Sequence, residues 1–171
     1  VKYVKTVLRT QKKLDSSGLN TSRFGVRGVE DLGGGLKAGF WLESTVNTDT
    51  GAADAAFWAR RATVSLFGDF GEVRLGRYKT ATKLHIEDFD PYSATGLGDV
   101  TKVFGNALGS GAGTFSRADN MVSYETPKNL GGFYGAADVA AGEGVNGNKM
   151  QDVRVGFKNG PVHVSAAFSS T

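Results

Sequence analysis

The residues with the most versatile chemistry, histidines and adjacent acids, are not spaced as a catalytic group in this sequence. His85 and His163 lie far apart and do not have the spacing of metal ligands. Glu87 and Asp88 are adjacent and could act as an acid and a base, but no nucleophile is spaced to work with them. The chain contains no Cys, which excludes thiolate metal sites and cysteine nucleophiles. We therefore expect no enzyme activity, no bound metal and no cofactor.

Charged side chains do recur at alternate positions of short segments, and this pattern indicates another kind of chemistry. Arginine and glutamate alternate there with apolar residues, so that one face of each segment is charged; examples are Arg23, Arg27, Glu43, Arg74 and Arg117. Such a face suits the lining of a wide, water-filled passage, which would select ions without transforming them. The net charge of +3 could instead indicate nucleic acid binding. However, the aromatic residues fall on the apolar faces and not among the basic residues, so we expect no nucleic-acid partner.

The elements that would position these charges are β-strands joined by glycine-rich turns. The chain has 171 residues, 40% of them hydrophobic, and its 25 Gly are about twice the average share of roughly 7%. Strand-like alternation is found in eight segments, 21–29, 36–46, 57–67, 70–77, 115–125, 133–140, 150–158 and 162–168, with a ninth, partial one at 1–8. Because both terminal segments read as strands in progress, we expect the chain to be part of a longer protein.

Short and long connections alternate between these strands. The short ones are 30–35, 68–69, 126–132 and 159–160, and the long ones are 9–20, 47–56, 78–114 and 141–149. This alternation is typical of an up-and-down barrel of the outer membrane, and the strand lengths approach the roughly 9–11 residues that cross a bilayer at a tilt. A soluble β-sandwich or lipocalin-like barrel that binds a ligand is the alternative, with the apolar faces in a core. The pattern favours an all-β, transmembrane, antiparallel up-and-down β-barrel.

Three segments of the sequence resemble the general porins of β-proteobacteria. They read SRFGVRGVEDLGGGLKA at 22–38, FGDFGEVRLGR at 67–77 and NMVSYETP at 120–127, and the agreement in order and spacing extends over residues 21–168. The resemblance implies a homotrimer of sixteen-stranded barrels in the outer membrane of a Gram-negative bacterium, in contact with lipid and lipopolysaccharide. Residues 1–171 would then be the N-terminal half of a single barrel domain, covering about strands 1–9.

The same resemblance implies where the pore is narrowest. The long third loop, 78–114, would fold into the barrel and face a basic wall made by Arg23, Arg60 and Arg117. Strand alternation does not place Arg60 on the inner face, so Arg61 and Arg27 are rivals for its role unless a bulge or a strand end turns Arg60 inward.

Counter-charges on that loop would shape the field across the pore. The candidates are Glu87, Asp88, Asp90 and Asp99, and the sequence leaves open which of them face the lumen. Elsewhere, Arg74 and Glu72 would line the lumen nearer the periplasmic end. Aromatic girdles of the membrane face, or plain packing, would account for Trp41, Phe40, Phe70, Tyr124 and Phe133.

A porin of this kind passes small hydrophilic solutes, anionic and neutral, by passive diffusion. Arginine stays charged at any relevant pH, and positive charge concentrated in a narrow throat raises the local concentration of anions. The sequence therefore predicts an anion-selective channel. A channel with a binding preference for small organic anions, and the soluble ligand-binding protein described above, are the alternatives.

Overall fold

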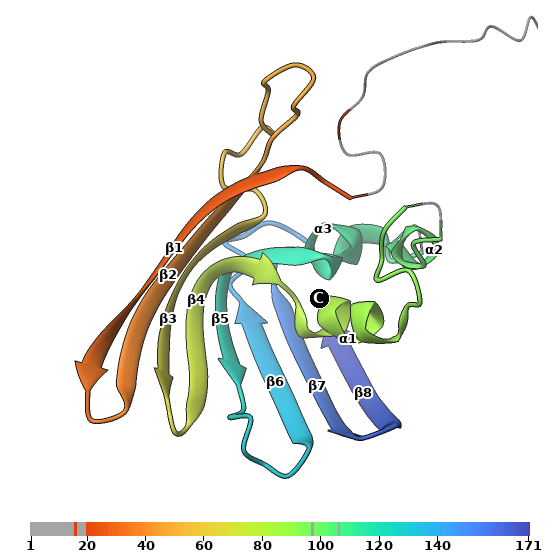
Figure 1. Cartoon of the computed structure of the whole chain (residues 1–171). Helices are drawn as coiled ribbons and strands as arrows, with labels where there is room; N and C mark the ends of the chain where they lie inside the picture. The colour runs from red at the N-terminus through yellow and green to blue at the C-terminus, as the bar shows by residue number, and fades with distance from the viewer. Residues whose placement is uncertain (1–15, 17–19, 97, 106) are drawn as a thin grey trace, which may run out of the picture.

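In the part of the chain that the structure describes, the wall is one sheet of eight antiparallel strands, and each strand pairs with its neighbours in sequence. The computed structural model describes residues 16, 20–96, 98–105 and 107–171. The sheet is curved, with the helices on its concave side (Figure 1). Its strands are β1 (Arg23–Gly33), β2 (Leu36–Thr45), β3 (Arg61–Gly68), β4 (Gly71–Lys79), β5 (Arg117–Glu125), β6 (Phe133–Ala140), β7 (Met150–Asn159) and β8 (Val162–Ser170). In the described ranges, no helix is both long and apolar enough to cross a membrane.

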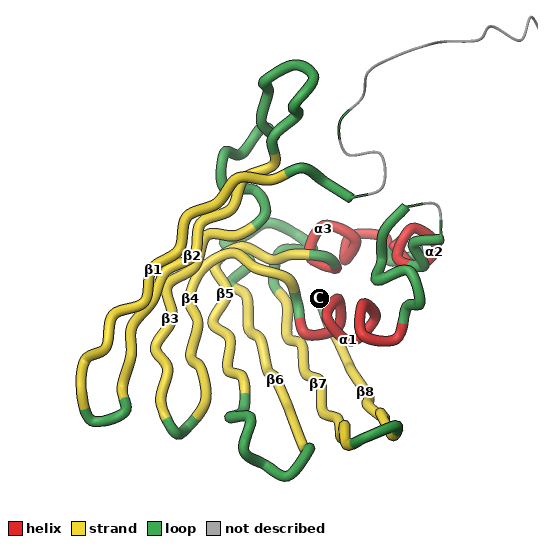
Figure 2. The backbone as a smooth tube through the Cα atoms, viewed as in Figure 1, coloured by secondary structure: helices red, strands yellow, loops and turns green. Residues whose placement is uncertain are grey.

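The short connections gather at one end of the sheet, which we call the short-turn end (Figure 2). Where β1 turns into β2, the last residue of β1, Gly33, and the two that follow it, Gly34 and Gly35, have φ values of 84°, 61° and 82°. Glycine adopts such values without steric cost, so the chain reverses within a few residues. The sequence-based turn began too early, because Glu30 and Asp31 are still paired within the sheet.

One face of the sheet carries a continuous apolar band. Its members Phe40, Val64, Leu75, Val122 and Val139 are register partners across five neighbouring strands, and each is 46–55% exposed. The concave face carries charged and small polar side chains instead. Apolar side chains that point away from a polar concavity are typical of a membrane barrel. The soluble alternative, which needs the apolar face in a core, does not describe this sheet.

The third predicted strand begins later than its sequence pattern indicated. β3 starts at Arg61, and the segment from Phe57 to Arg60 lies outside the strand. The backbone N–H of Arg60 donates to the carbonyl oxygen of Glu43 at 3.2 Å, which closes the loop at the strand entrance. The rings of Phe57 and Trp58 pack edge to face there, with centroids 4.6 Å apart. The partial strand predicted at 1–8 lies outside the described residues.

The long segment between β4 and β5 contains helices, whereas its sequence suggested a structureless loop. It holds α1 (Ala81–Phe89), α2 (Thr101–Gly105), a single 3₁₀ turn, η1 (Gly109–Gly111), and α3 (Ala112–Phe115). Thr80 caps α1 by accepting the N–H of Lys83 at 3.1 Å, and its hydroxyl donates to the carbonyl oxygen of Phe115 at 2.7 Å. Thr80 therefore ties the beginning of the segment to its end. The segment folds over the concave face, where α1 contacts β6, β7 and β8.

Candidate functional site

Two of the predicted basic residues meet at one carboxylate on the concave wall. The Oε1 atom of Glu43, on β2, accepts a hydrogen bond of 2.7 Å from the Nε of Arg60. The Nη1 of Arg23, on β1, lies 3.9 Å from the same oxygen. The side chains of Arg60 and Glu43 are 13% and 16% exposed, whereas that of Arg23 is 40% exposed. Arg23 and Arg60 thus share a single negative charge, with Arg23 facing solvent.

The third predicted residue, Arg117, joins these two from the start of β5. Its Nε donates to the backbone carbonyl oxygen of Arg60 at 2.9 Å. Simple alternation along β5 is not sufficient to place it, because the β4–β5 register shifts between Gly76 and Tyr78, and Asn120 beside the shift has a φ of 53°. Its hydrogen bond to the backbone of Arg60 shows instead that Arg117 lies beside the other two arginines. We call Arg23, Arg60 and Arg117, gathered around Glu43, the arginine cluster.

The two rivals, Arg27 and Arg61, also lie on the concave face but form a separate group. Arg61 is the register partner of Glu43, and its Nε donates to the hydroxyl of Thr63 at 2.9 Å. The guanidinium carbons of Arg61 and Arg27 are 4.2 and 5.3 Å from the centre of the Trp41 ring. Trp41 therefore faces the concave side, so of the two alternatives for this residue the structure supports packing and not a lipid-facing girdle.

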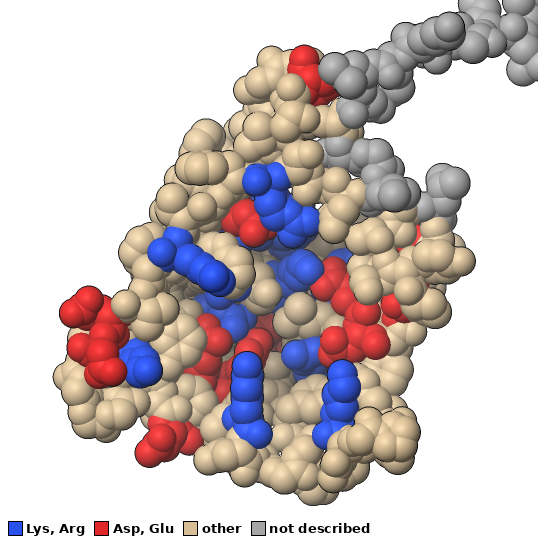
Figure 3. Space-filling view, viewed as in Figure 1, with Lys and Arg blue, Asp and Glu red and all other residues tan. Residues whose placement is uncertain are grey.

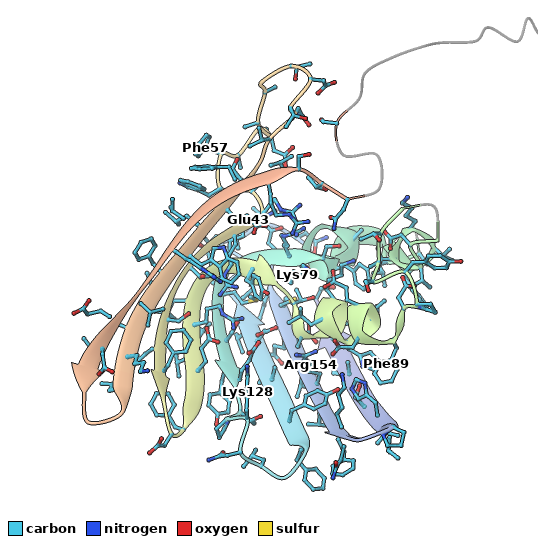
Figure 4. All side chains as sticks on the ribbon, in the orientation of Figure 1. Glu43, Phe57, Lys79, Phe89, Lys128 and Arg154 are labelled. Atoms are coloured by element: carbon cyan, nitrogen blue, oxygen red, sulfur yellow. The ribbon has the colours of Figure 1, made fainter. Side chains whose placement is uncertain are left out.

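Two of the four acidic loop residues face cations of the wall. The Oε2 of Glu87, on α1, accepts from the Nζ of Lys79 at 2.6 Å, and its Oε1 is 3.6 Å from the Nζ of Lys83. The Oδ2 of Asp88 lies 3.1 Å from the Nη1 of Arg154 on β7. Figure 4 shows Lys79 and Arg154 on the side of the wall that α1 covers. Both pairs join the loop to the wall by opposite charges.

Asp90, the third acidic residue, organises the loop itself. The backbone N–H groups of Tyr92, Ala94 and Val100 donate to its carboxylate at 2.9, 3.0 and 3.3 Å. Hydrogen bonds from these backbone groups, that of Tyr92 first, hold the pKa of Asp90 below its usual range. The ionised carboxylate accepts these three bonds more strongly than a protonated carboxyl group would. Asp90 is buried, so its charge serves the loop fold.

Asp99 has a similarly local role at the start of α2. Its Oδ1 accepts from the backbone N–H and the hydroxyl of Thr101, at 2.9 and 2.6 Å. A short acidic side chain at this position satisfies donors that the first helical turn leaves free. Of the four acidic candidates, the structure brings Glu87 and Asp88 to charged wall residues and keeps Asp90 and Asp99 within the loop.

Two wall aspartates that the sequence analysis did not single out fix the start of α1. Asp138 on β6 accepts the N–H of Ala81 at 2.7 Å. Asp152 on β7 accepts the N–H and the hydroxyl of Thr82, at 2.8 and 2.5 Å. The two aspartates are register partners, and both side chains are buried. Carboxylates suit this position because the first N–H groups of a helix lack partners within it. The sequence offered one signal for these two residues, an acidic side chain on the inner face of each of two neighbouring strands.

The two histidines connect the loop to the last strand. The Nδ1 of His85, on α1, lies 2.6 Å from the hydroxyl of Ser165 on β8. The ring of His163 stacks on Phe89, at the end of α1, with centroids 4.5 Å apart, and its Nε2 is 2.8 Å from the hydroxyl of Tyr134. Both histidines therefore sit in contacts that hold α1 against the wall.

Taken together, the site is a polar concavity with an ordered loop inside it. Lys and Arg side chains gather over much of this face, with Asp and Glu among them (Figure 3). Nearer the short turns, Arg74 donates two hydrogen bonds to Glu72, of 2.9 and 2.8 Å. In the described part of the chain, no three His, Asp or Glu residues are grouped as metal ligands. The arrangement can attract and order charged solutes in water.

Comparison with known proteins identifies the family to which this wall belongs. The family model described as "Gram-negative porin" matches residues 1–171. Outer membrane porin protein 32 of Delftia acidovorans is 52% identical over 121 residues, which are 70% of this chain and 34% of that protein. A second outer membrane porin protein, from Bordetella pertussis, is 32% identical over 165 residues, 87% of this chain and 42% of that protein.

A solved structure, that of the anion-selective porin from Comamonas acidovorans, has the same fold. It superimposes with a TM-score of 0.81 and 41% sequence identity, over 91% of this chain and 48% of that one. The chain thus spans less than half the length of each of these three proteins. From the family match, the named relatives and the shared wall, the chain belongs to the Gram-negative porins, proteins of the outer membrane.

Proposed function

We propose that the whole protein forms a water-filled channel through which small hydrophilic solutes diffuse passively, with a preference for anions. The observation that carries the proposal is the arginine cluster, in which two guanidinium groups share the carboxylate of Glu43 and the third, that of Arg117, bonds to the backbone of Arg60. Positive charge held at one level of a passage raises the local concentration of anions. The porin family points to a channel and not to an enzyme, and the solved relative is titled anion-selective.

We infer that the segment between β4 and β5 is the part of the channel that narrows it. Its helix α1 is anchored to three strands through Asp138, Asp152 and Ser165. Its acids Glu87 and Asp88 are already paired with Lys79 and Arg154. The loop therefore adds little free negative charge to offset the arginine cluster. This balance supports the anion preference.

The proposal also includes the assembly of the whole protein. A sheet in a membrane must close, because lipid cannot satisfy the backbone groups of an open edge. Since the solved relative is about twice as long as this chain, we propose a closed barrel of sixteen strands in a homotrimer that contacts lipid and lipopolysaccharide. Small anionic and neutral molecules are its proposed solutes.

A planar-bilayer recording of the full-length protein under a KCl gradient tests this function. We expect large, long-lived conductance steps in multiples of three and a reversal potential of the sign set by chloride. Steps with a reversal potential of the opposite sign would contradict the anion preference, and intact protein that never conducts would contradict the channel itself.

A further inference from the structure

Five side chains of the concave wall form a stack in which cations and aromatic rings alternate. Arg61 lies between two rings, with its guanidinium carbon 4.2 Å from the centre of Trp41 and 4.1 Å from the centre of Tyr78. Arg27 covers the Trp41 ring at 5.3 Å, and Arg74 covers the Tyr78 ring at 4.6 Å. Rings hold guanidinium groups by their π faces and leave the N–H groups at the edges free to donate.

The charges of this stack are only partly neutralised. Arg74 is paired with Glu72 at 2.8 Å and with Glu125 at 3.3 Å. In the ranges that the structure describes, no ion pair joins Arg27 or Arg61 to a carboxylate. Arg27 is exposed on the wall, so its N–H groups can reach a solute.

A hollow of about 440 Å³ lies beside the stack, lined by Arg27, Arg61 and Trp41 among others. Its size falls within the roughly 300–1,000 Å³ of small-molecule sites. Gly39 lies in its lining, with Phe67 and Val29 beside it: a Cβ at this glycine would be 3.1 Å from the Phe67 ring and 3.3 Å from a Val29 methyl. These two side chains therefore already cover Gly39 and present their apolar surfaces to the hollow. The hollow thus has a cationic end and an apolar end.

We propose that this hollow is a binding subsite for small aromatic carboxylates, of which benzoate is the simplest. The carboxylate accepts hydrogen bonds from Arg27 and Arg61, and the ring packs against the apolar surface that Phe67 and Val29 present to the hollow. An inorganic anion would gain nothing from the apolar end. Glu72 also lines the hollow, where its charge is paired with that of Arg74. This subsite rests on the proposed channel function, which brings solutes to the wall.

The first test compares benzoate with one probe that lacks the aromatic ring and one that lacks the carboxylate. Full-length protein is placed in a planar bilayer in KCl, and benzoate, acetate or benzyl alcohol is added. We expect benzoate to interrupt the chloride current in a saturable way, with acetate and benzyl alcohol at least about tenfold weaker, because each lacks one of the two contacts. Equal effects of benzoate and acetate would contradict the proposed contact of the ring with the apolar end. Equal effects of benzoate and benzyl alcohol would contradict the proposed contact of the carboxylate with the cationic end.

The second test uses matched variants of two cations on the same face of neighbouring strands. Arg27→Gln removes a charge from the hollow, whereas Lys37→Gln removes one from β2 near the turn, outside its lining. We expect benzoate binding to weaken about tenfold in Arg27→Gln, the order of one charge-assisted hydrogen bond, and to stay unchanged in Lys37→Gln. Equal weakening in both variants would overturn the subsite.

A third variant and a second readout keep the two proposals separable. Phe67→Ala removes one apolar side of the hollow, and we expect weaker binding of benzoate with acetate unaffected; an unchanged benzoate affinity would contradict the proposed pose. The reversal potential is measured in the same channels. Anion selectivity without a benzoate effect would overturn the subsite alone, whereas cation selectivity would overturn the proposed function.

Discussion

At the scale of single residues, the balance between the arginine cluster and Glu43 sets the charge of the wall. Glu43 is the only carboxylate that the described structure places within 4.0 Å of Arg23 or Arg60. Glu43→Gln keeps a hydrogen-bond acceptor for Arg60 but removes the charge. A unit charge contributes about 1 kcal/mol at 4 Å in water, so we expect anion preference to rise by up to about fivefold.

The reversal potential under a salt gradient measures this change. Asp31→Asn is the matched control, since it removes a carboxylate near the β1–β2 turn whose one ion pair among the described residues is with Lys37 at 4.0 Å. The amide oxygen can still accept the hydrogen bond that the N–H of Gly33 donates to Asp31 at 2.9 Å. We expect it to leave the preference unchanged. A fall in anion preference in Glu43→Gln would show that Glu43 positions the arginines more than it neutralises them.

Asp90 makes the order of the loop depend on pH. Its pKa is lowered in the folded protein by the three backbone N–H groups, so its contribution to stability is complete above the ordinary aspartate pKa of about 3.9. The contribution is lost as the pH falls through the lowered pKa. We expect amide hydrogen exchange at Ala94 and Val100 to accelerate, beyond the intrinsic rate, only in that acidic range.

Asp90→Asn is the variant that tests this assignment. An amide has one acceptor oxygen and cannot take all three bonds. In the place of Oδ2 it keeps Ala94 and Val100 and loses Tyr92, and in the place of Oδ1 it keeps Tyr92 and loses the other two. Exchange at one of these two sets of amides should therefore already be fast at neutral pH. Asp99, in the same loop, accepts side-chain hydrogen bonds only from Thr101 among the described residues, so Asp99→Asn should leave those amides protected. Protection that is the same in Asp90→Asn and the native protein would contradict the role of Asp90.

At the scale of elements, α1 is held in place by the wall and not by its own sequence. Thr82 contributes through its hydroxyl, which donates to Asp152 at 2.5 Å. Thr82→Val removes this bond and leaves a buried carboxylate short of a partner, which costs roughly 1–3 kcal/mol. We expect noisier single-channel current and faster proteolysis of the loop, because α1 detaches more often.

Thr95→Val is the matched control for this prediction. The Thr95 hydroxyl donates to the carbonyl oxygen of Tyr92 at 2.6 Å, entirely within the loop. The same substitution there removes a hydrogen bond without touching the wall. Equal noise in the two variants would mean that the anchoring of α1 to β7 does not steady the channel.

The elements differ in how far the sequence alone could predict them. Alternation located all eight described strands, because each strand has one apolar and one polar face, a local property. The helix α1 was missed because its stability comes from Asp138 and Asp152, which lie about fifty to seventy positions away along the chain. Contacts of that kind leave no periodic signal in a short segment.

In the candidate site, too, some features could be predicted from the sequence and others depend on contacts between distant segments. Arg23, Arg60 and Arg117 were found by resemblance, and the structure brings them together, while their part in selectivity stays a prediction. Alternation could not settle Arg60, since that residue precedes the strand. It placed Arg117 on the inner face, although a register shift separates this residue from the centre of β5. The cation–ring stack was not predicted, because Trp41, Arg61 and Tyr78 come from three different strands.

At the scale of the whole molecule, the apolar band must contact lipid or another subunit. Val122 on the band and Val29 on the polar face are similarly exposed, at 53% and 65%. Exposure alone predicts similar effects of a charge at the two sites. The membrane account predicts that Val122→Arg costs roughly 2–4 kcal/mol of unfolding free energy in lipid, and that Val29→Arg costs little.

Urea titration of the full-length protein folded into lipid vesicles measures both free energies. Val29→Arg points its charge into water on the concave side, where arginines already line the wall. If the two variants lost stability equally, the band would not face the membrane. If Val29→Arg were the more damaging, the assignment of the two faces would be reversed.

The measurement that tests the central claim most directly is the reversal potential of the channel with the arginine cluster neutralised. Full-length protein carrying Arg23→Gln, Arg60→Gln and Arg117→Gln is compared with the native protein in the same KCl gradient. We predict that the native channel reverses at a potential of anionic sign, and that the triple variant moves most of the way to zero while still conducting. A conducting triple variant with unchanged anion selectivity would contradict the account.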